Sequence, residues 1–253
     1  MSAYFSDLTL EEQDGRKGYV TDTCTSTMDL AWNLFDQGLI LEYEFILSKH
    51  QTRGRGQFGR EWVSDSGNLF ATVRLPDSAQ TLDNLLPLAT ALCVVNTLEP
   101  LHIPAMIKWP NDIMIGHAKI GGILIETKGP VVMAGMGLNI RSAPESSRNE
   151  IFFHIKAGCL KEFGVNLKPS EIWHLILTKT KRHLPDMISA PSLVAENAQR
   201  RLAFKGDPVV LEDTGENDGP ARILGIDQNG SLIIETIKGI KTIHQGRVFP
   251  WVI

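Results

Sequence analysis

Cysteine is scarce in this chain and is not arranged to hold a metal or a set of disulfides. The three cysteines, Cys24, Cys93 and Cys159, lie far apart and form no Cys-x-x-Cys pair. An odd number of widely spaced cysteines indicates neither a disulfide framework nor a zinc knuckle, and it fits a reducing compartment. The seven histidines show no close metal-ligand spacing, so we predict no structural metal site.

The sequence also lacks a membrane-spanning run and a secretion signal. Its longest apolar run, Leu85–Val95, is about half as long as the ~20 residues that cross a bilayer. The first residues, Met1–Tyr19, carry acidic side chains and no basic region followed by an apolar one. We therefore expect a cytoplasmic protein that does not bind a membrane.

An excess of positive charge is lacking as well. Lysine and arginine number 25 against 29 aspartates and glutamates, which gives a net charge of −4. This balance argues against a broadly basic surface for nucleic acid. The 43% hydrophobic and 21% charged residues are those of a soluble globular protein, long enough for one large or two unequal domains.

Against this background, Arg53–Trp62 is rich in arginine and glycine. Glycine lets backbone N–H groups come close to a ligand, and arginine offers a planar fork of donors that fits a phosphate or carboxylate. The spacing matches neither the P-loop nor the dinucleotide-binding motif. Alone, the stretch predicts an anion-binding loop, with a nucleic-acid contact or a solvated turn as equal alternatives.

Hydrophobic periodicity predicts the elements around this loop. Apolar residues at helical spacing predict a helix over Thr27–Gln37, and Phe45–Leu47 and Leu69–Leu75 predict strands on either side of the loop. A buried helix is predicted over Asp83–Glu99, with Asp83 as its N-cap.

The second half of the chain predicts more strands. Ala105–Trp109, Ile120–Thr127 and Val131–Ile140 are typical of an antiparallel meander, and Glu171–Met187 is typical of a helix. After this helix the sequence pattern changes to short runs that are typical of strands: Pro208–Leu211, Ala221–Ile226, Ser231–Thr236 and Lys241–His244. We predict a domain boundary near residue 202, followed by a small barrel or sandwich.

Two polar motifs lie at the ends of predicted strands. Lys108–Asp112 closes one strand, and Lys119–Glu126 opens the next with a lysine and paired glycines. If the intervening turn is tight, Asp112 and Lys119 lie near each other, close to the arginine–glycine loop. Taken singly, Asp112 is equally well a capping carboxylate and Lys119 a solvated charge.

Together, these motifs resemble the biotin–protein ligase family in its bacterial stand-alone form. The matching segments occur in the family's order: Ser26-Thr27, Gln51, Gly54–Trp62, Lys108–Asp112, Lys119–Leu124 and Gly137–Asn139. The resemblance covers most of the chain. It implies an α+β fold with a central mixed or antiparallel sheet flanked by helices: a biotin- and ATP-binding catalytic domain over 1–202 and a small SH3-like β-barrel over 203–253.

The resemblance implies a ligase that activates biotin with ATP to biotinyl-5′-AMP and transfers the biotinyl group to a lysine of a biotin carboxyl carrier protein. Two anions meet in such a reaction, so cations must neutralise them and water must be kept out. Arg55 and Lys119 match the positions that bind the biotin carboxylate and the α-phosphate. Asp112 would accept hydrogen bonds from the incoming ammonium or help to deprotonate it. Mg²⁺ would arrive with ATP.

Binding residues also follow from the resemblance. Ser26, Thr27 and Gln51 match the positions that bind the ureido ring, while Trp62 and the backbone around Asn139 match the adenine side. The complete set is Ser26, Thr27, Met28, Gln51, Gly54, Arg55, Gly56, Gln57, Arg60, Trp62, Asn111, Lys119, Gly122 and Asn139. The plainer interpretations are a helix N-cap for Ser26 and a core anchor for Trp62.

The chain departs from the family at two of these positions. Gln57 stands where many members have a second arginine, and Met28 where many have an asparagine. The loss of one cation at Gln57 predicts weaker retention of the acyl-adenylate. Only about 20 residues precede Val20, too few for an independently folding helix-turn-helix domain, so we expect no DNA binding.

Three other functions stay open at this point. A lipoate-type acyl ligase shares the fold, but its apolar substrate head does not need ureido-binding groups. A non-catalytic biotin sensor would bind biotin without transfer. A nucleic-acid-binding protein would use the arginine–glycine loop, against the acidic net charge. The sequence identifies neither the acceptor carrier nor the oligomeric state, and it is compatible with a homodimer.

Overall fold

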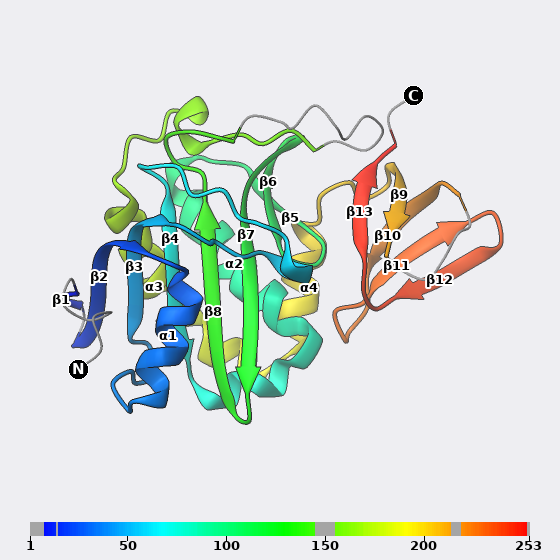
Figure 1. Ribbon diagram of the computed structural model, residues 1–253. Coiled ribbons are helices and arrows are strands. Elements are labelled where there is room, and N and C mark those ends of the chain that lie inside the picture. The colour runs from blue at the N-terminus through cyan, green and yellow to red at the C-terminus, as the bar shows by residue number, and fades with distance from the viewer. Residues whose placement is uncertain (1–7, 14, 145–154, 214–218, 252–253) are drawn as a thin grey trace.

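The computed structural model describes residues 8–13, 15–144, 155–213 and 219–251, which build two separate sheets and the helices around them (Figure 1). Eight strands form a sheet of order β1-β2-β3-β4-β8-β7-β6-β5, and five form a second sheet of order β12-β11-β10-β9-β13. Neighbouring strands of the large sheet are antiparallel except for the parallel pair β2 and β3. The predicted α+β fold with a mixed sheet and a small C-terminal β-module is confirmed.

The strands of the large sheet are β1 (Thr9–Gln13), β2 (Arg16–Cys24), β3 (Phe45–Gln51), β4 (Leu69–Leu75), β5 (Ala105–Lys108), β6 (Asp112–Ile115), β7 (Ala118–Lys128) and β8 (Val131–Leu138). Those of the small sheet are β9 (Pro208–Glu212), β10 (Ala221–Ile226), β11 (Leu232–Thr236), β12 (Gly239–Ile243) and β13 (Arg247–Pro250). The α-helices are α1 (Thr27–Asp36), α2 (Leu86–Leu98), α3 (Pro169–Ser189) and α4 (Ser192–Arg200). Short 3₁₀ segments are η1 (Gln57–Gly59), η2 (Asp77–Leu85), η3 (Glu99–Leu101) and η4 (Leu160–Phe163).

Helices cover both faces of the large sheet (Figure 1). Helix α1 lies over β3, β4 and β8, where Leu34 and Ile46 share one core cluster. Helices α2 and α3 lie on the opposite face, where Leu92 and Trp173 belong to a second, larger cluster. The helix predicted over Thr27–Gln37 is confirmed. It begins where the Ser26 side chain accepts a hydrogen bond from the Met28 N–H, so Ser26 is its N-cap.

The helix predicted over Asp83–Glu99 begins later in the structure than the sequence predicts. The segment Asp77–Leu85 is 3₁₀ helix, and α2 begins directly from it at Leu86. Asp83 has φ 46° and ψ −122° and makes no cap, so the predicted N-cap is wrong. Among the described residues, Asp77–Leu101 is the segment long and apolar enough to span a bilayer, and 72% of its most apolar window is buried inside the protein. Its apolar side chains therefore form core contacts.

The predicted meander is confirmed, but it has four strands. The additional strand β6 begins at Asp112, directly after a turn that contains the cis Trp109–Pro110 peptide bond. Asp112 is therefore paired with Lys108 in β5 on one side and with Gly122 in β7 on the other. The prediction also missed β1, β2, α4 and β13.

A turn of the small sheet contacts a turn of the large sheet through a hydrogen bond. The Asp227–Gly230 turn follows β10, as predicted, and Gly230 has the positive φ of 85° that such a turn requires. Its carbonyl oxygen accepts a 2.8 Å hydrogen bond from the indole N–H of Trp109. Residues 1–7, 14 and 252–253 of the predicted domains lie outside the described residues, as do 145–154 and 214–218. The boundary at residue 202 stays a prediction.

Candidate active site

One cavity gathers most of the predicted site residues, although they come from five separate stretches of the chain. Its walls come from the start of α1, the loop after β3, and strands β4, β6, β7 and β8. The predicted residues that line it are Ser26, Thr27, Met28, Gln51, Arg55, Gly56, Gln57, Arg60, Trp62, Asn111, Asp112, Lys119 and Gly122. The two predicted cations, Arg55 and Lys119, therefore face the same space.

Two predicted residues do not line this cavity. A Cβ atom at Gly54 would lie 2.4 Å from the Trp62 carbonyl oxygen, so this position lets two stretches of the loop approach each other. Asn139 is buried, and its side-chain amide donates to the Gly158 carbonyl oxygen at 3.1 Å. Both residues shape the backbone around the cavity, and their predicted contacts with a ligand stay predictions.

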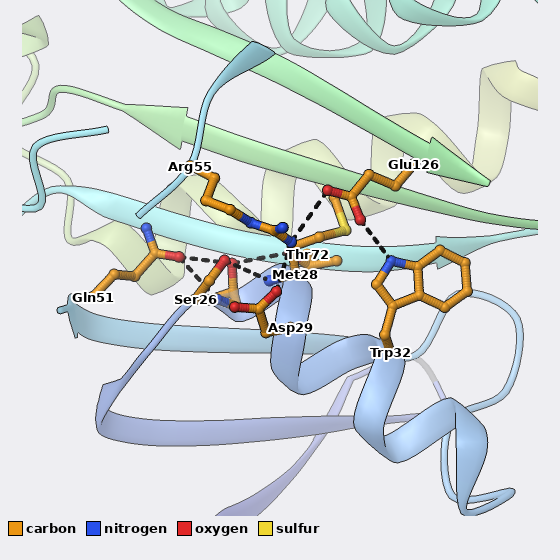
Figure 2. A network of polar contacts seen from close by, with 9 residues as sticks. Ser26, Met28, Asp29, Trp32, Gln51, Arg55, Thr72 and Glu126 are labelled. Carbon is orange, nitrogen blue, oxygen red and sulfur yellow. Dashed lines mark hydrogen bonds and ion pairs between the residues drawn. The ribbon is translucent and has the colours of Figure 1, made fainter. Parts of the chain in front are cut away.

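A buried polar network forms one end of the cavity (Figure 2). The Gln51 Oε1 atom accepts hydrogen bonds from the backbone N–H and the hydroxyl of Thr27, at 2.8 and 3.2 Å. The Thr72 hydroxyl donates to the Thr27 hydroxyl oxygen at 2.9 Å. Thr72 was missed because nothing distinguishes it from any other threonine in a buried strand. Networks of this kind fix donors and acceptors in place, so this end suits a polar ring.

A cluster of buried charges forms the other end. The Asp112 carboxylate lies 2.6 Å from Lys108 Nζ through Oδ2 and 2.5 Å from Lys119 Nζ through Oδ1. Burial would raise the pKa of Asp112, but the charges of Lys119 and Lys108 lower that pKa to about 2. Burial lowers the pKa of Lys108 from its usual value. Asp112 is thus ionised at neutral pH. A carboxylate with so low a pKa is a weak base, which favours its accepting role over deprotonation.

Asp112 should make the folded chain less stable in acid. Because its pKa falls from 3.8 to about 2 on folding, its contribution is present above pH 3.8 and is lost as the pH falls toward 2. The contribution corresponds to about 2 kcal/mol. Urea unfolding at pH 7 and pH 3 measures it as the difference between wild type and Asp112→Asn. The exposed Asp22→Asn variant is the matched control, and a loss in acid that is the same in all three proteins would contradict the prediction.

Trp62 packs against glycines of two neighbouring strands. A Cβ atom at Gly137 would lie 2.4 Å from the indole ring, and one at Gly122 would lie 3.3 Å from it. The Lys119 Nζ atom is 5.6 Å from the ring centroid, within reach of a cation–π interaction. Gly137 also lines the cavity but was not among the predicted site residues. The two glycines leave room for the indole, which forms part of the cavity wall.

Arg55 reaches across the cavity mouth to two carboxylates that the sequence did not single out (Figure 2). Its Nη2 atom lies 2.6 Å from Asp29 Oδ1 and 3.2 Å from Glu126 Oε1. The Trp32 indole N–H donates to the other Glu126 oxygen at 2.8 Å. Asp29 lies in a helix and Glu126 in a strand, and neither is part of a motif. Only the fold brings them to the loop.

The cavity coincides with the segment that a known family shares. The sequence model of the Biotin/lipoate A/B protein ligase family matches residues 19–140, which contain every residue that lines it. A biotin–[acetyl-CoA-carboxylase] ligase of Paracoccus denitrificans is 30% identical over 215 residues, which cover 81% of this chain and 89% of the relative. The chain belongs to the biotin–protein ligase family.

Further members support this assignment. The biotin–[acetyl-CoA-carboxylase] ligase of Mycobacterium tuberculosis is 31% identical over 199 residues, covering 75% of this chain and 72% of the relative. The biotin protein ligase of Aquifex aeolicus, solved in complex with biotin and ATP, superposes with a TM-score of 0.78 at 25% identity and covers 91% of this chain and 97% of its own. The family expected from the motifs is confirmed, and so is the ligase fold.

Metal ligands are sparse around the ligase cavity. Within the described part of the chain, no group of three or more histidine, cysteine, aspartate and glutamate side chains could hold a metal ion, and His154 lies outside that part. Two carboxylates line the cavity, those of Glu61 and Asp112, and Asp112 is already shared by two ammonium groups. These residues fit a Mg²⁺ ion that keeps phosphate oxygens and waters as its ligands.

Proposed function

We propose that this chain activates biotin with ATP to biotinyl-5′-AMP and transfers the biotinyl group to a lysine of a biotin carboxyl carrier protein. The observation that carries the proposal is the shared cavity of Arg55 and Lys119, with the hydrogen-bonding network of Thr27, Gln51 and Thr72 at its far end. A ureido ring needs matched donors and acceptors once it is buried, and an acid and a phosphate need cations.

In the first step, a carboxylate oxygen of biotin attacks the α-phosphorus of ATP. The new P–O bond forms while the bond to the β-phosphate breaks, and pyrophosphate leaves. Arg55 and Lys119 bind the carboxylate and the α-phosphate, so that the two anions can approach each other. Charge-assisted hydrogen bonds of this kind contribute about 1.5–3 kcal/mol each. Bound Mg²⁺ adds charge neutralisation at the phosphates.

In the second step, the lysine amine of the carrier attacks the acyl carbon of biotinyl-AMP. The lysine ammonium first loses a proton to solvent. A C–N bond then forms as the C–O bond to the phosphate breaks, AMP leaves, and the nitrogen releases a second proton to solvent. Each oxygen of the Asp112 carboxylate contacts one ammonium group, that of Lys108 or Lys119, and keeps a further lone pair that can accept a hydrogen bond from an incoming ammonium. Its low pKa supports orientation of the lysine rather than removal of its proton.

One assay distinguishes this function from its alternatives. The chain is incubated with biotin, Mg-ATP and a carrier domain, and both AMP formation and the mass of the carrier are followed. We expect AMP and a carrier heavier by one biotinyl group, and no product when lipoate replaces biotin. Modification with lipoate would favour a lipoate-type ligase, and binding of labelled biotin with ATP but without transfer would favour a sensor.

The setting of the reaction is part of the proposal. We propose a cytoplasmic enzyme with a catalytic domain over 1–202 and an SH3-like domain over 203–253, and no DNA partner. The net charge of −4 supports the absence of a DNA-binding surface. A homodimer is compatible with this function.

Gln57→Arg should slow the escape of biotinyl-AMP. Gln57 lines the cavity and two neighbouring cavities toward the small sheet, so it lies where the intermediate would leave. An arginine there would add a charge-assisted hydrogen bond to the phosphate, which predicts about tenfold slower release. Trapping of free biotinyl-AMP with hydroxylamine measures it, with Gln57→Lys and Gln57→Glu as charge controls. Unchanged leakage in the arginine variant would show that charge at this position has no role.

A further inference from the structure

We propose that Asp29 and Glu126 are positioning residues, which hold Arg55 at the cavity mouth before the substrates bind, and that Trp32 fixes the direction of Glu126. We call Asp29 and Glu126 the carboxylate clamp. The inference rests on the proposed function, in which Arg55 binds the biotin carboxylate. It adds two acidic residues that act on biotin only through that arginine.

The clamp joins segments that are far apart in the chain (Figure 2). Asp29 lies in the first turn of α1 and Glu126 near the end of β7, while Arg55 belongs to the arginine–glycine loop. The same helix and strand supply Met28 and Leu124 to the cavity wall. The two ion pairs therefore tie the loop to both walls of the cavity that it borders.

Glu126 is oriented by a buried group. Its Oε2 atom accepts the hydrogen bond of the Trp32 indole, and Trp32 is only 6% exposed. A buried indole N–H needs an acceptor, so the glutamate satisfies the tryptophan while the tryptophan aligns the glutamate. The Lys128 Nζ atom lies 4.5 Å from the centroid of the same ring and packs the indole from outside. With one oxygen on the indole and the other on the guanidinium, the plane of the carboxylate is fixed.

The geometry of the guanidinium points to positioning and not to competition with the substrate. Both carboxylates contact the same nitrogen, Nη2 of Arg55. Neither of these contacts uses the single N–H group of Nε or the two of Nη1, and each of these can still donate a hydrogen bond to the carboxylate of a ligand. Arg55 can thus be held through Nη2 and still donate to a ligand through its other two nitrogens.

The exposure of the clamp favours a weak contact that stabilises the ordered loop but still lets the loop open. Ordering a loop costs conformational entropy at every residue, and a glycine-rich loop loses the most freedom. Ordering part of the loop beforehand spares the substrate part of that cost. Arg55 and Asp29 have side chains 41% and 45% exposed, and an ion pair this close to solvent is weak because water screens it. The loop can therefore still open to admit biotin.

Substitutions that remove one charge and keep the side-chain size test the clamp. For Asp29→Asn and Glu126→Gln, we expect the KM for biotin in biotinyl-AMP formation to rise about threefold to tenfold, with kcat changed less than about twofold. Trp32→Phe should move the KM in the same direction by a smaller factor. The matched control is Asp22→Asn, which breaks the exposed Asp22–Lys49 ion pair. An unchanged KM in both clamp variants, or a lower one, would overturn the proposal.

Cleavage by trypsin tests the same contacts without catalysis. The loop carries Arg53, Arg55 and Arg60, so an unclamped loop offers three cleavage sites. Without ligands, both clamp variants should be cut several-fold faster there than wild type and Asp22→Asn, with unchanged thermal unfolding. Equal cleavage rates would show that the clamp does not order the loop. If wild type formed no biotinyl-AMP, the proposed function would fail, while cleavage would still decide whether the clamp exists.

Discussion

Lys119→Ala should slow the formation of biotinyl-AMP by about a hundredfold to a thousandfold, the usual loss when one preorganised donor at a developing charge is removed. Lys119 lines the same cavity as Arg55, and Asp112 holds its ammonium at 2.5 Å. Its side chain is 31% exposed, so part of its hydration shell is replaced by fixed protein groups. Such a cation stabilises charge on the transferred phosphoryl group better than mobile water does.

Pyrophosphate release with biotin and Mg-ATP measures this effect. Lys49→Ala is the matched control, because Lys49 is also a lysine paired with an aspartate, but its side chain is 71% exposed. It should retain the wild-type rate. Asp112 keeps its contact with Lys108 in the Lys119→Ala protein, so the site should stay folded. Near-normal turnover of Lys119→Ala would refute the proposed role of its charge.

Asp112→Ala should destabilise the fold by about 3–5 kcal/mol, because it leaves a buried ammonium without its counter-charge. The Lys108 side chain is only 7% exposed, and Asp112 is its ion-pair partner at 2.6 Å. Lys119 also loses its partner, but it is close enough to solvent to be hydrated. Urea unfolding at pH 7 measures the loss as a lower midpoint with an unchanged slope.

A double variant separates the charge from the packing. Lys108→Met with Asp112→Leu replaces the buried pair by apolar side chains of similar volume, a change that is often neutral. We expect the double variant to recover most of the stability and to stay inactive in transfer. If Asp112→Ala unfolded at the wild-type urea concentration, Lys108 and Asp112 would not form a coupled buried ion pair.

Motif order predicted much of this site, because the motifs lie where strands end and begin. A tight turn between Asp112 and Lys119 was enough to bring these two residues together, and the structure has that turn, at Gly116 and His117 between β6 and β7. The glycines on either side of Arg55 likewise marked a loop between two strands. Local sequence carries this information, since a turn and its flanking residues are neighbours in the chain.

The residues that the sequence did not reveal are joined only by the fold. Asp29 lies in α1 and Glu126 in β7, and most strands of the large sheet lie between them in the sequence. Neither residue belongs to a motif that marks it as a partner of Arg55. Strand β6 was missed because a proline-containing polar motif precedes it. Strand β1 was missed because four of its five residues are exposed, so it has no alternation of apolar and polar side chains.

The hydrogen bond between the indole of Trp109 and the carbonyl oxygen of Gly230 limits how far the molecule can be trimmed. Trp109 is 2% exposed and follows Lys108 directly, at the turn that leads to Asp112. Deleting the last five strands would uncover this ring and strip its N–H of an acceptor, one residue from the ammonium that the aspartate neutralises. An enzyme built from the large sheet alone would therefore lose a contact that supports the turn between Lys108 and Asp112.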